Sequence, residues 1–449
     1  MLCDRGGIAS AATGDAMKRR FARRVLVAVI ALAGIGVLAF KLFEPVFHYV
    51  SGWAPLPDGP WPSASVHAPG WEDTAAEAGA WLVETRAALG APALSAAVSV
   101  DGERVWAGAA GYADLATRAA ATLETAFRIG SSSKALTSIA IGVLLDDGAL
   151  DLDAPISRYM PDLSEPLASI TTRQAMSHTA GVRHYGLCLC FPIWEYYGTK
   201  HYRSQREALR AFERSDLLFP PGEGFSYSSH GYNIAGAVIE SVTAVSFGEH
   251  LRARVTEPLG LSGTRAEDGT QHADDATFYE LRDGRYLEVF PVDNTNRLAA
   301  GGIVSTPSDM VRLGHQMIEP TLFGDATRDM LVRPQPLADG RPNPQRYALG
   351  WRVHELDILD GTEQTLVLHH HGVAYGARSS FSVYPEYGVV VSVMMSKHED
   401  GFDEAPARLA DLFIAAVKAR GEAPSAGSLS AGGAVQASGD GAGVDVSAE

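Results

Sequence analysis

The chain carries a single Ser-x-x-Lys segment, Ser131 to Lys134, at a point where a helix is expected to begin. Asp147-Gly148 gives the matching stop signal. Apolar residues recur between them at helical spacing, at Ala135, Leu136, Ile139, Val143 and Leu144. At the start of a helix this spacing places the lysine amine one turn from the serine hydroxyl, on the same face. A hydroxyl is a poor nucleophile until a neighbour takes its proton, so the pair predicts serine acyl-transfer chemistry.

The spacing alone does not establish an active site, because about one or two such matches are expected by accident in a chain of this length. The alternative is an ordinary N-cap serine followed by a solvated lysine. A later segment favours catalysis. Tyr227 lies in the turn-rich stretch 221–229, before a predicted helix over 231–239, and a tyrosine on such a loop can reach into a cleft.

A third segment lies near the end of the predicted domain. His370-His371-Gly372 follows a predicted strand over 365–368, and residues 376–385 lead into another strand. The edge of a strand at this point can supply a backbone N–H to an oxyanion hole.

The chain contains S-x-x-K, then a tyrosine motif, then H-x-G. In the order of these three motifs it resembles the serine β-lactamase and penicillin-binding protein superfamily. The flanking segments are most similar to its class C and esterase-like branch, and residues 181–185 and 291–294 are closest in appearance to the mitochondrial serine β-lactamase-like proteins. Family-like blocks extend from about residue 74 to residue 418; they include Gly111–Asp114, Leu150–Ile156, Ser177–Val182, Glu257–Leu261 and Ala300–Thr306.

The resemblance implies roles for individual residues. Ser131 becomes the nucleophile, Lys134 its base or electrostatic partner, and Tyr227 the proton relay to the leaving group. The third motif maps onto His370 and Gly372. The expected oxyanion hole consists of the backbone N–H groups of Ser131 and Val373.

Two residues depart from the family pattern. Ser229 stands where the superfamily usually has asparagine, and His370 where a lysine is usual. A titrating imidazole binds a substrate carboxylate less firmly than a permanent cation does. We therefore expect small esters to be better substrates than penicillins or D-Ala-D-Ala peptides. The function indicated is a serine hydrolase, either an esterase, a D-amino-acid peptidase or a weak β-lactamase; the alternative is a catalytically vestigial scaffold or filament-forming protein.

The N-terminal part has a different composition. Residues 1–24 contain a basic cluster, and residues 25–43 form an apolar run that predicts an uncleaved transmembrane signal anchor with the N-terminus inside. A cleaved signal peptide and a buried core helix are the alternatives. The prediction is a single-pass inner-membrane protein with a periplasmic catalytic domain. Residues 44–72 are expected to be a Pro/Gly-rich spacer, and residues 421–449 a disordered tail.

Between spacer and tail, residues 73–420 predict one hydrolase domain of the α/β (α+β) class. The expected helices cover 74–89 and 405–418, and the expected strands cover 94–100, 105–107, 349–353, 365–368, 379–384 and 389–395. These strands should form an antiparallel sheet flanked by the N- and C-terminal helices. Residues 164–294 should form an inserted, mainly helical lobe, with the cleft between the two parts.

Charge and metal-ligating residues limit the partners. A net charge of −16 makes nucleic acid an unsuitable partner. His369 and His371 would share a face of a strand, but no zinc-binding motif accompanies them, so we expect neither a metal nor another cofactor. Cys188 and Cys190 indicate an apolar loop near the cleft and no structural disulfide. The expected partners are a small-molecule or peptide substrate and the membrane, and the sequence is compatible with a homo-oligomer.

Overall fold

The computed structural model describes residues 7–163, 165–187, 194–398, 402 and 405–421. The predicted tail from residue 422 onward and all three cysteines lie outside the described residues. The chain divides into two units, Met1–Ala54 and Pro55–Glu449. The first unit is the helix α1 (Gly7–Ser51). Its segment Arg19–Lys41 has a mean hydropathy of 2.1, is not buried, and is long and apolar enough to cross a membrane.

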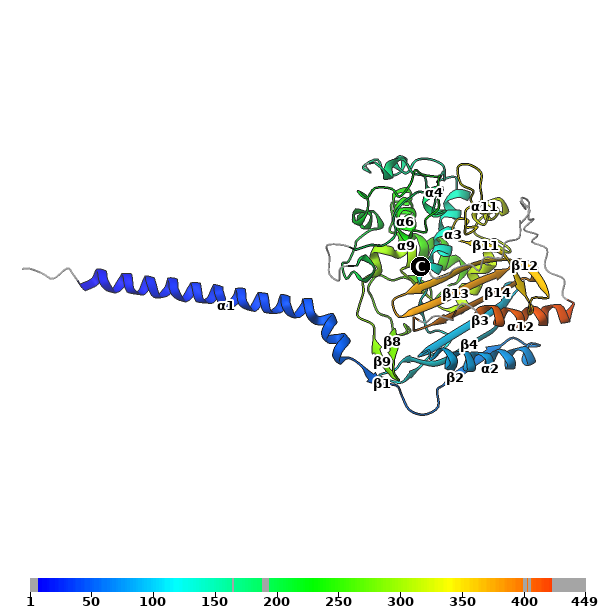
Figure 1. Ribbon diagram of the computed structural model, residues 1–449, viewed down its shortest axis with the longest axis horizontal. Coiled ribbons are helices and arrows are strands. Elements are labelled where there is room, and N and C mark those ends of the chain that lie inside the picture. Colours follow the sequence, from blue (N-terminus) through cyan, green and yellow to red (C-terminus); the bar gives the residue numbers. More distant parts are fainter. Residues whose placement is uncertain (1–6, 164, 188–193, 399–401, 403–404, 422–449) are drawn as a thin grey trace, which may run out of the picture. The chain divides into compact units, whose positions relative to one another are not determined.

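The second unit is built on an antiparallel sheet with the strand order β11-β12-β13-β14-β3-β4-β2, and β5 pairs with β4 (Figure 1). The strands are β2 (Ser63–His67), β3 (Ala93–Val100), β4 (Glu103–Asp114), β5 (Ala119–Ala120), β11 (Arg352–Ile358), β12 (Glu363–Ala374), β13 (Ala377–Tyr384) and β14 (Val389–Met395). The ladders between these neighbours are antiparallel. The predicted class and the predicted antiparallel sheet are confirmed.

Strand β2 lies within residues 44–72, which the sequence predicted to be a spacer. It pairs with β4 from Ser63 opposite Ala110 to His67 opposite Trp106. All five β2 side chains are exposed, so backbone hydrogen bonds hold this edge strand to the sheet. Ala64 and Val66 alternate with polar residues here, but the run is only five residues long and follows closely spaced prolines, so the sequence did not distinguish this strand from an extended spacer.

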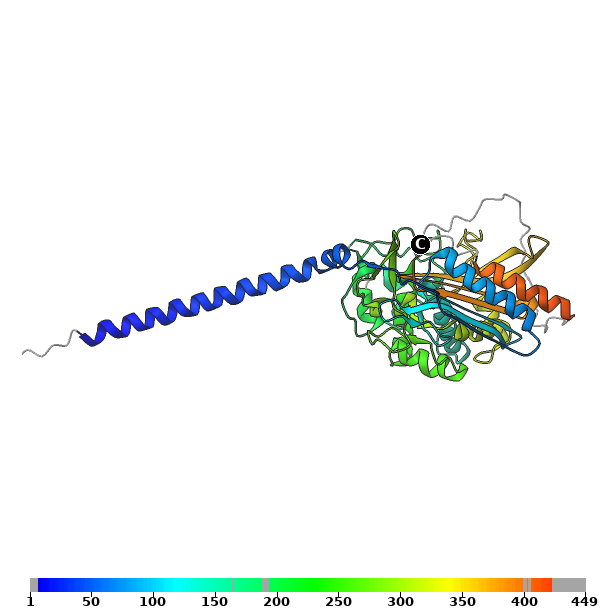
Figure 2. The ribbon, with the colours of Figure 1, turned by 90° about the horizontal axis from the view of Figure 1, so that it is seen from below.

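Two helices cover one face of the sheet, α2 (Glu72–Leu89) and α12 (Ala405–Arg420), and Figure 2 shows them side by side. Aromatic side chains form the centre of this layer. The Phe413 ring centroid lies 5.5 Å from that of Trp71 and 6.3 Å from that of Trp106. Helix α2 ends at Gly90, which takes the left-handed conformation (φ 61°) typical of a helix C-cap.

The helical lobe covers the opposite face (Figure 1). Its central helix, α3 (Ser133–Asp146), is preceded by the 3₁₀ turn η1 (Gly130–Ser132) and is buried from Ser133 to Leu144. Around it lie α4 (Thr172–Met176), α5 (Gln205–Ala208), α6 (Ser229–Thr243), α7 (Phe247–Leu251), α8 (Glu257–Leu259), the 3₁₀ turn η7 (Asn294–Arg297), α9 (Leu298–Gly301), α10 (Pro307–Gly314) and α11 (Asp325–Leu331). The remaining strands are β1 (Ala54–Pro55), β6 (Phe127–Arg128), β7 (Arg265–Ala266), β8 (Tyr279–Arg282), β9 (Arg285–Glu288) and β10 (Ile303–Ser305).

Three strands differ clearly from the sequence prediction, and one of them is β4, which covers Glu103–Asp114 in place of 105–107. Strand β11 covers 352–358 in place of 349–353, and β12 continues to Ala374 in place of ending at residue 368. The extension arises because β12 and β13 form one hairpin, in which Ala374 pairs with Ala377 across a two-residue turn. The three histidines and Gly372 therefore lie inside the strand.

Candidate active site

The structure brings the predicted serine and lysine into contact. Lys134 Nζ donates hydrogen bonds to Ser131 Oγ (2.9 Å), Ser229 Oγ (3.2 Å) and the backbone oxygen of Ala300 (2.8 Å). Lys134 is fully buried, whereas Ser131 is partly exposed. Three acceptors thus hold the amine beside the serine oxygen. In its neutral form the amine can take the serine proton along the same 2.9 Å line.

The acceptor Ala300 is placed by a small sheet that joins both sides of the site. Strand β6 enters η1, strand β10 follows α9, and the two pair with Val304 opposite Arg128. Helix α9 is also tied to α3, because Thr137 Oγ1 donates to the backbone oxygen of Ala299 at 2.7 Å. The sequence marked this region only as the family-like block 300–306.

Tyr227 lies directly before α6, next to the lysine. Its ring centroid is 5.0 Å from Lys134 Nζ and 5.6 Å from the Arg352 guanidinium carbon, so the lysine amine and a permanent cation both lie near the phenol ring. A cation close to a tyrosine favours negative charge on its oxygen, as a proton relay requires. The sequence analysis placed Arg352 in a predicted strand but did not identify it as a residue of the site.

Two histidines hold the loop that carries Tyr227. Ser228 N donates to His178 Nδ1 at 3.1 Å, and Ser229 N donates to His184 Nδ1 at 3.1 Å. His178 thus has the backbone partner expected of a structural histidine, and its ring centroid lies 4.3 Å from that of Tyr227. Burial, followed by the charge of Lys134, lowers the pKa of His184 to about 3. Both imidazoles therefore remain neutral acceptors at physiological pH.

Gly372 allows β12 to approach η1. A Cβ atom on Gly372 would lie 1.9 Å from the Ile129 oxygen, and one on Gly130 would lie 2.4 Å from the Val373 oxygen. Along an antiparallel ladder, hydrogen-bonded and non-hydrogen-bonded residue pairs alternate. Ala374 and Ala377 close the hairpin as a hydrogen-bonded pair, so the next pair, Val373 and Arg378, is not hydrogen-bonded. The N–H and C=O groups of Val373 therefore point away from β13. The β11 pairing ends at His369, which leaves this edge of β12 to η1. The Val373 N–H is thus directed to the side expected for an oxyanion hole.

His370 does not lie in the cavity, contrary to the expected role in holding a substrate carboxylate. It is fully buried, its Nε2 lies 2.9 Å from the Tyr347 hydroxyl and its Nδ1 lies 2.6 Å from the His371 oxygen. Burial, together with the charges of Arg352 and Lys134, lowers the pKa of His370 well below its usual value. His370 is therefore a buried, neutral partner of Tyr347, and the expected ester preference loses its basis in a titrating site for a carboxylate.

Ser131, Tyr227, Ser229 and Val373 open onto a cavity of about 500 Å³. Its other walls are largely aromatic, with two basic residues and one acid that the sequence did not indicate: Tyr185, Trp194, Tyr196, Tyr197, Tyr375, Arg297, Lys397 and Glu280. These residues come from segments far apart in the chain, and Trp194 borders the predicted cysteine loop, which lies outside the described residues.

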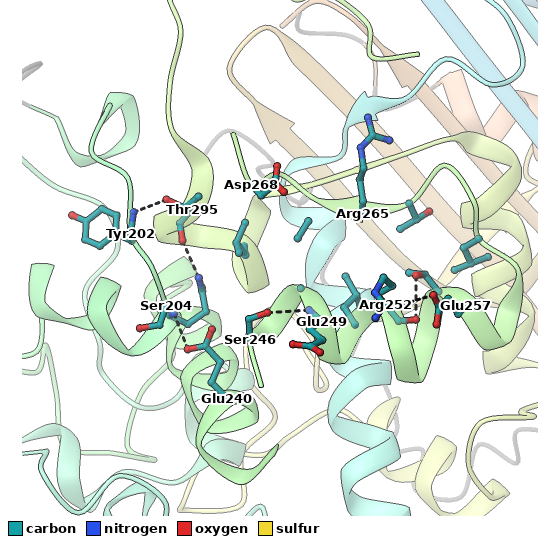
Figure 3. Close-up of a pocket in the computed structure, with 18 of the residues that line it drawn as sticks. Tyr202, Ser204, Glu240, Ser246, Glu249, Arg252, Glu257, Arg265, Asp268 and Thr295 are labelled. Carbon is teal, nitrogen blue, oxygen red and sulfur yellow. Dashed lines mark hydrogen bonds and ion pairs between the residues drawn. The ribbon is translucent and has the colours of Figure 1, made fainter. Parts of the chain in front are cut away.

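A larger cavity of about 910 Å³ lies elsewhere in the helical lobe (Figure 3). The backbone N–H of Gln205 donates to Glu240 there at 2.8 Å, so this half-buried acid stabilises a helix N-terminus. The wall between the cavities is shared. Thr295 and Leu298 face the larger one, while Arg297 and Ala300 face the smaller one. Ser131 lines the smaller cavity and not the larger one.

Histidines also cluster on the sheet. His369 and His371 share a face, as predicted, with ring centroids 5.1 Å apart, and His354 Nδ1 lies 2.8 Å from His369 Nε2. Over the described ranges of the chain, no three His, Cys, Asp or Glu side chains form a group that could hold a metal ion.

Buried neutral histidines predict acid-sensitive stability. Burial lowers the pKa of His230 and His354 to about 4 each, and that of His178, His369 and His370 well below the usual value. Unfolding exposes imidazoles that bind protons below about pH 6.5, so their stabilising effect is complete above that pH and is lost as the pH falls. Each group contributes a slope of about 1.4 kcal/mol per pH unit.

We therefore expect the urea midpoint to fall steeply between pH 6.5 and pH 4.5. In His354→Gln, the slope of unfolding free energy against pH should decrease by about 1.4 kcal/mol per unit. Urea unfolding followed by circular dichroism at several pH values measures both. An unchanged slope in the variant would show that His354 titrates alike in the folded and unfolded states.

Comparison with known proteins agrees with this geometry. Residues 79–416 match the family described as Beta-lactamase. The chain is 26% identical over 417 residues to the human protein "Serine beta-lactamase-like protein LACTB, mitochondrial", an alignment covering 72% of this chain and 76% of the relative. It is 26% identical over 307 residues to a D-aminopeptidase of Gluconobacter oxydans, covering 62% and 56% of the two chains. The crystal structure of D-amino acid amidase from Ochrobactrum anthropi SV3 has the same fold, with a TM-score of 0.64, 21% identity, and coverage of 78% and 99%.

Proposed function

This chain belongs to the beta-lactamase family, and we propose that it is a serine hydrolase in which Ser131 forms an acyl-enzyme with an ester or amide substrate. The observation that carries the proposal is the contact of 2.9 Å between Lys134 Nζ and Ser131 Oγ, at the wall of a cavity of about 500 Å³. Family relatives include a beta-lactamase and a D-aminopeptidase, both hydrolases.

In the proposed mechanism, neutral Lys134 takes the Ser131 proton while Oγ attacks the substrate carbonyl carbon. The N–H groups of Ser131 and Val373 bind the oxyanion that forms. Collapse of this intermediate breaks the bond to the leaving group, which receives a proton from Tyr227, and Tyr227 regains a proton from Lys134. Water then attacks the acyl-enzyme by the same steps in reverse, releasing the acid and restoring Ser131.

Within this chemistry, we propose an esterase, a D-amino-acid peptidase or amidase, or a weak β-lactamase. The D-aminopeptidase relative supports the second of these, and the neutral His370 leaves the third without the lysine cation that the superfamily usually has at that position. All three activities require Ser131 to act as a nucleophile. Fluorophosphonate labelling of the full-length protein, followed by peptide mass spectrometry, tests this requirement. Modification of Ser131 supports the hydrolase, and an unreactive protein would favour the vestigial scaffold.

We also propose that α1 anchors the domain to the inner membrane, with the domain in the periplasm. The supporting observations are the unburied apolar segment Arg19–Lys41 and the basic residues Arg19, Arg20, Arg23 and Arg24 at its beginning. The full-length protein should remain in the membrane fraction after carbonate washing, and in spheroplasts its domain should be digested by added protease. A soluble product that begins after Phe40 would contradict the anchor and indicate a cleaved signal peptide.

A further inference from the structure

Glu280, on strand β8, is an acid in the wall of the catalytic cavity. Its Oε1 accepts a hydrogen bond from the Tyr375 hydroxyl at 3.1 Å. Across the described part of the chain, no lysine, arginine or histidine nitrogen lies within 4.0 Å of this carboxylate, although such pairs occur at many other acids. A carboxylate has about four acceptor positions, so Glu280 keeps acceptor capacity that faces the cavity.

The cations of the cavity are held by protein oxygens. The Arg297 guanidinium donates to the backbone oxygen of Tyr196 and to Asn296 Oδ1 (3.1 Å), and it lies 4.5 Å from the Tyr196 ring centroid. Lys397 Nζ donates to the backbone oxygen of Leu89 at 3.1 Å. Both cations thus have protein partners, and no ion pair within 4.0 Å joins either of them to Glu280 in the described part of the chain.

Aromatic rings complete the surroundings of Glu280. The Tyr197 and Tyr375 ring centroids are 4.9 Å apart in an edge-to-face arrangement, and both residues line the cavity. Burial, followed by the charge of Glu280, raises the pKa of both phenols, so Tyr375 keeps its proton and donates to the carboxylate. An acid beside tyrosine rings is an environment that recognises organic cations.

We propose that Glu280, Tyr197 and Tyr375 form a subsite for a positively charged ammonium group of the substrate. The inference rests on the proposed function and specifies its substrate class. Tyr375 follows Val373 by two residues, in the turn that joins β12 to β13, so the two Cα atoms are at most about 7 Å apart. An ammonium beside Tyr375 is then within reach of a carbonyl bound at the Val373 N–H, which assigns the charge to the acyl part of the substrate.

The test compares the two enantiomers of an amide that carries an amine with the same amide without the amine. D- and L-phenylalaninamide carry it, and 3-phenylpropanamide has hydrogen in its place. Each should slow fluorophosphonate labelling of Ser131 according to its affinity, whether or not it is cleaved. We expect the better phenylalaninamide enantiomer to protect at a concentration at least about tenfold lower than 3-phenylpropanamide, a difference of about 1.4 kcal/mol.

In Glu280→Gln this preference should disappear, while protection by 3-phenylpropanamide and the labelling rate without ligand change less than about twofold. Glu288→Gln is the matched control, because Glu288 lies on the adjacent strand β9 and does not line the catalytic cavity; it should keep the preference. Equal protection by amine and analogue in the natural protein, or a preference that survives in Glu280→Gln, would overturn the subsite. In both cases labelling of Ser131 persists, so the proposed hydrolase would stand, whereas an unlabelled protein refutes the hydrolase itself.

Discussion

Ser131→Ala should abolish covalent labelling by a fluorophosphonate and lower kcat by a factor on the order of 10⁶, since loss of a serine nucleophile leaves only binding and oxyanion stabilisation. Folding should change little. Ser131 is partly exposed, and its hydroxyl contacts Lys134 at the cavity wall and fills no core position. Labelling is read by in-gel fluorescence, activity by hydrolysis of an activated ester, and folding by thermal unfolding.

Ser133→Ala is the matched control, two residues along in the same segment. Its hydroxyl is buried and has no hydrogen-bond partner among the described residues, so removing it should leave labelling intact and stability equal or slightly higher. If Ser131→Ala were labelled to the same extent as Ser133→Ala, Ser131 would not be the nucleophile.

Gly372→Ala should impair both stability and catalysis, because the new Cβ would lie 1.9 Å from the Ile129 oxygen and 2.6 Å from Ser379 Oγ. The nearer contact is backbone, so β12 must move away from η1. We expect a loss of about 1–3 kcal/mol in unfolding free energy. The movement also separates the Val373 N–H from Ser131, and a displacement of about 1 Å at a reacting centre costs about 10²-fold in rate.

Gly79→Ala controls for the loss of a glycine. Gly79 lies within α2, and its nearest neighbour to a new Cβ is Ser65 Oγ at 3.8 Å, an ordinary contact. Alanine there should raise stability by about 0.5–1 kcal/mol and leave the labelling rate unchanged. Denaturant unfolding and labelling kinetics compare the two variants. A Gly372→Ala protein as stable and reactive as Gly79→Ala would mean that the approach of β12 to η1 is not required.

Features set by neighbouring residues could be predicted from the sequence. The three-residue spacing of Ser131 and Lys134 puts both on one helix face wherever the helix lies, and the turn before α6 presents Tyr227. Helices α2 and α12 and the hairpin of β3 and β4 followed from apolar periodicity and turn signals, since these patterns repeat within a single element.

The position of a side chain relative to distant segments could not be predicted in this way. His370 was assigned to the cavity because of its motif, yet it does not line the cavity and is buried in contact with Tyr347. In a strand, one residue of difference moves a side chain to the opposite face, and only the packing around β12 decides which face meets the cavity. The edge strand β2 was missed for a related reason, because its backbone pairing with β4 is independent of side-chain hydrophobicity.

By itself, the sequence determined the pairing of Ser131 with Lys134, the order of the motifs and the class of the fold, because each follows from contacts within about one turn of helix or one hairpin. Only the tertiary structure decided which charges the cavity contains. Ser131, Glu280 and Tyr375 are separated by about a hundred residues or more, and they meet where β8, β12 and η1 converge. Such a meeting depends on strand register and on glycines that allow close backbone approach, and neither leaves a periodic signal in the chain.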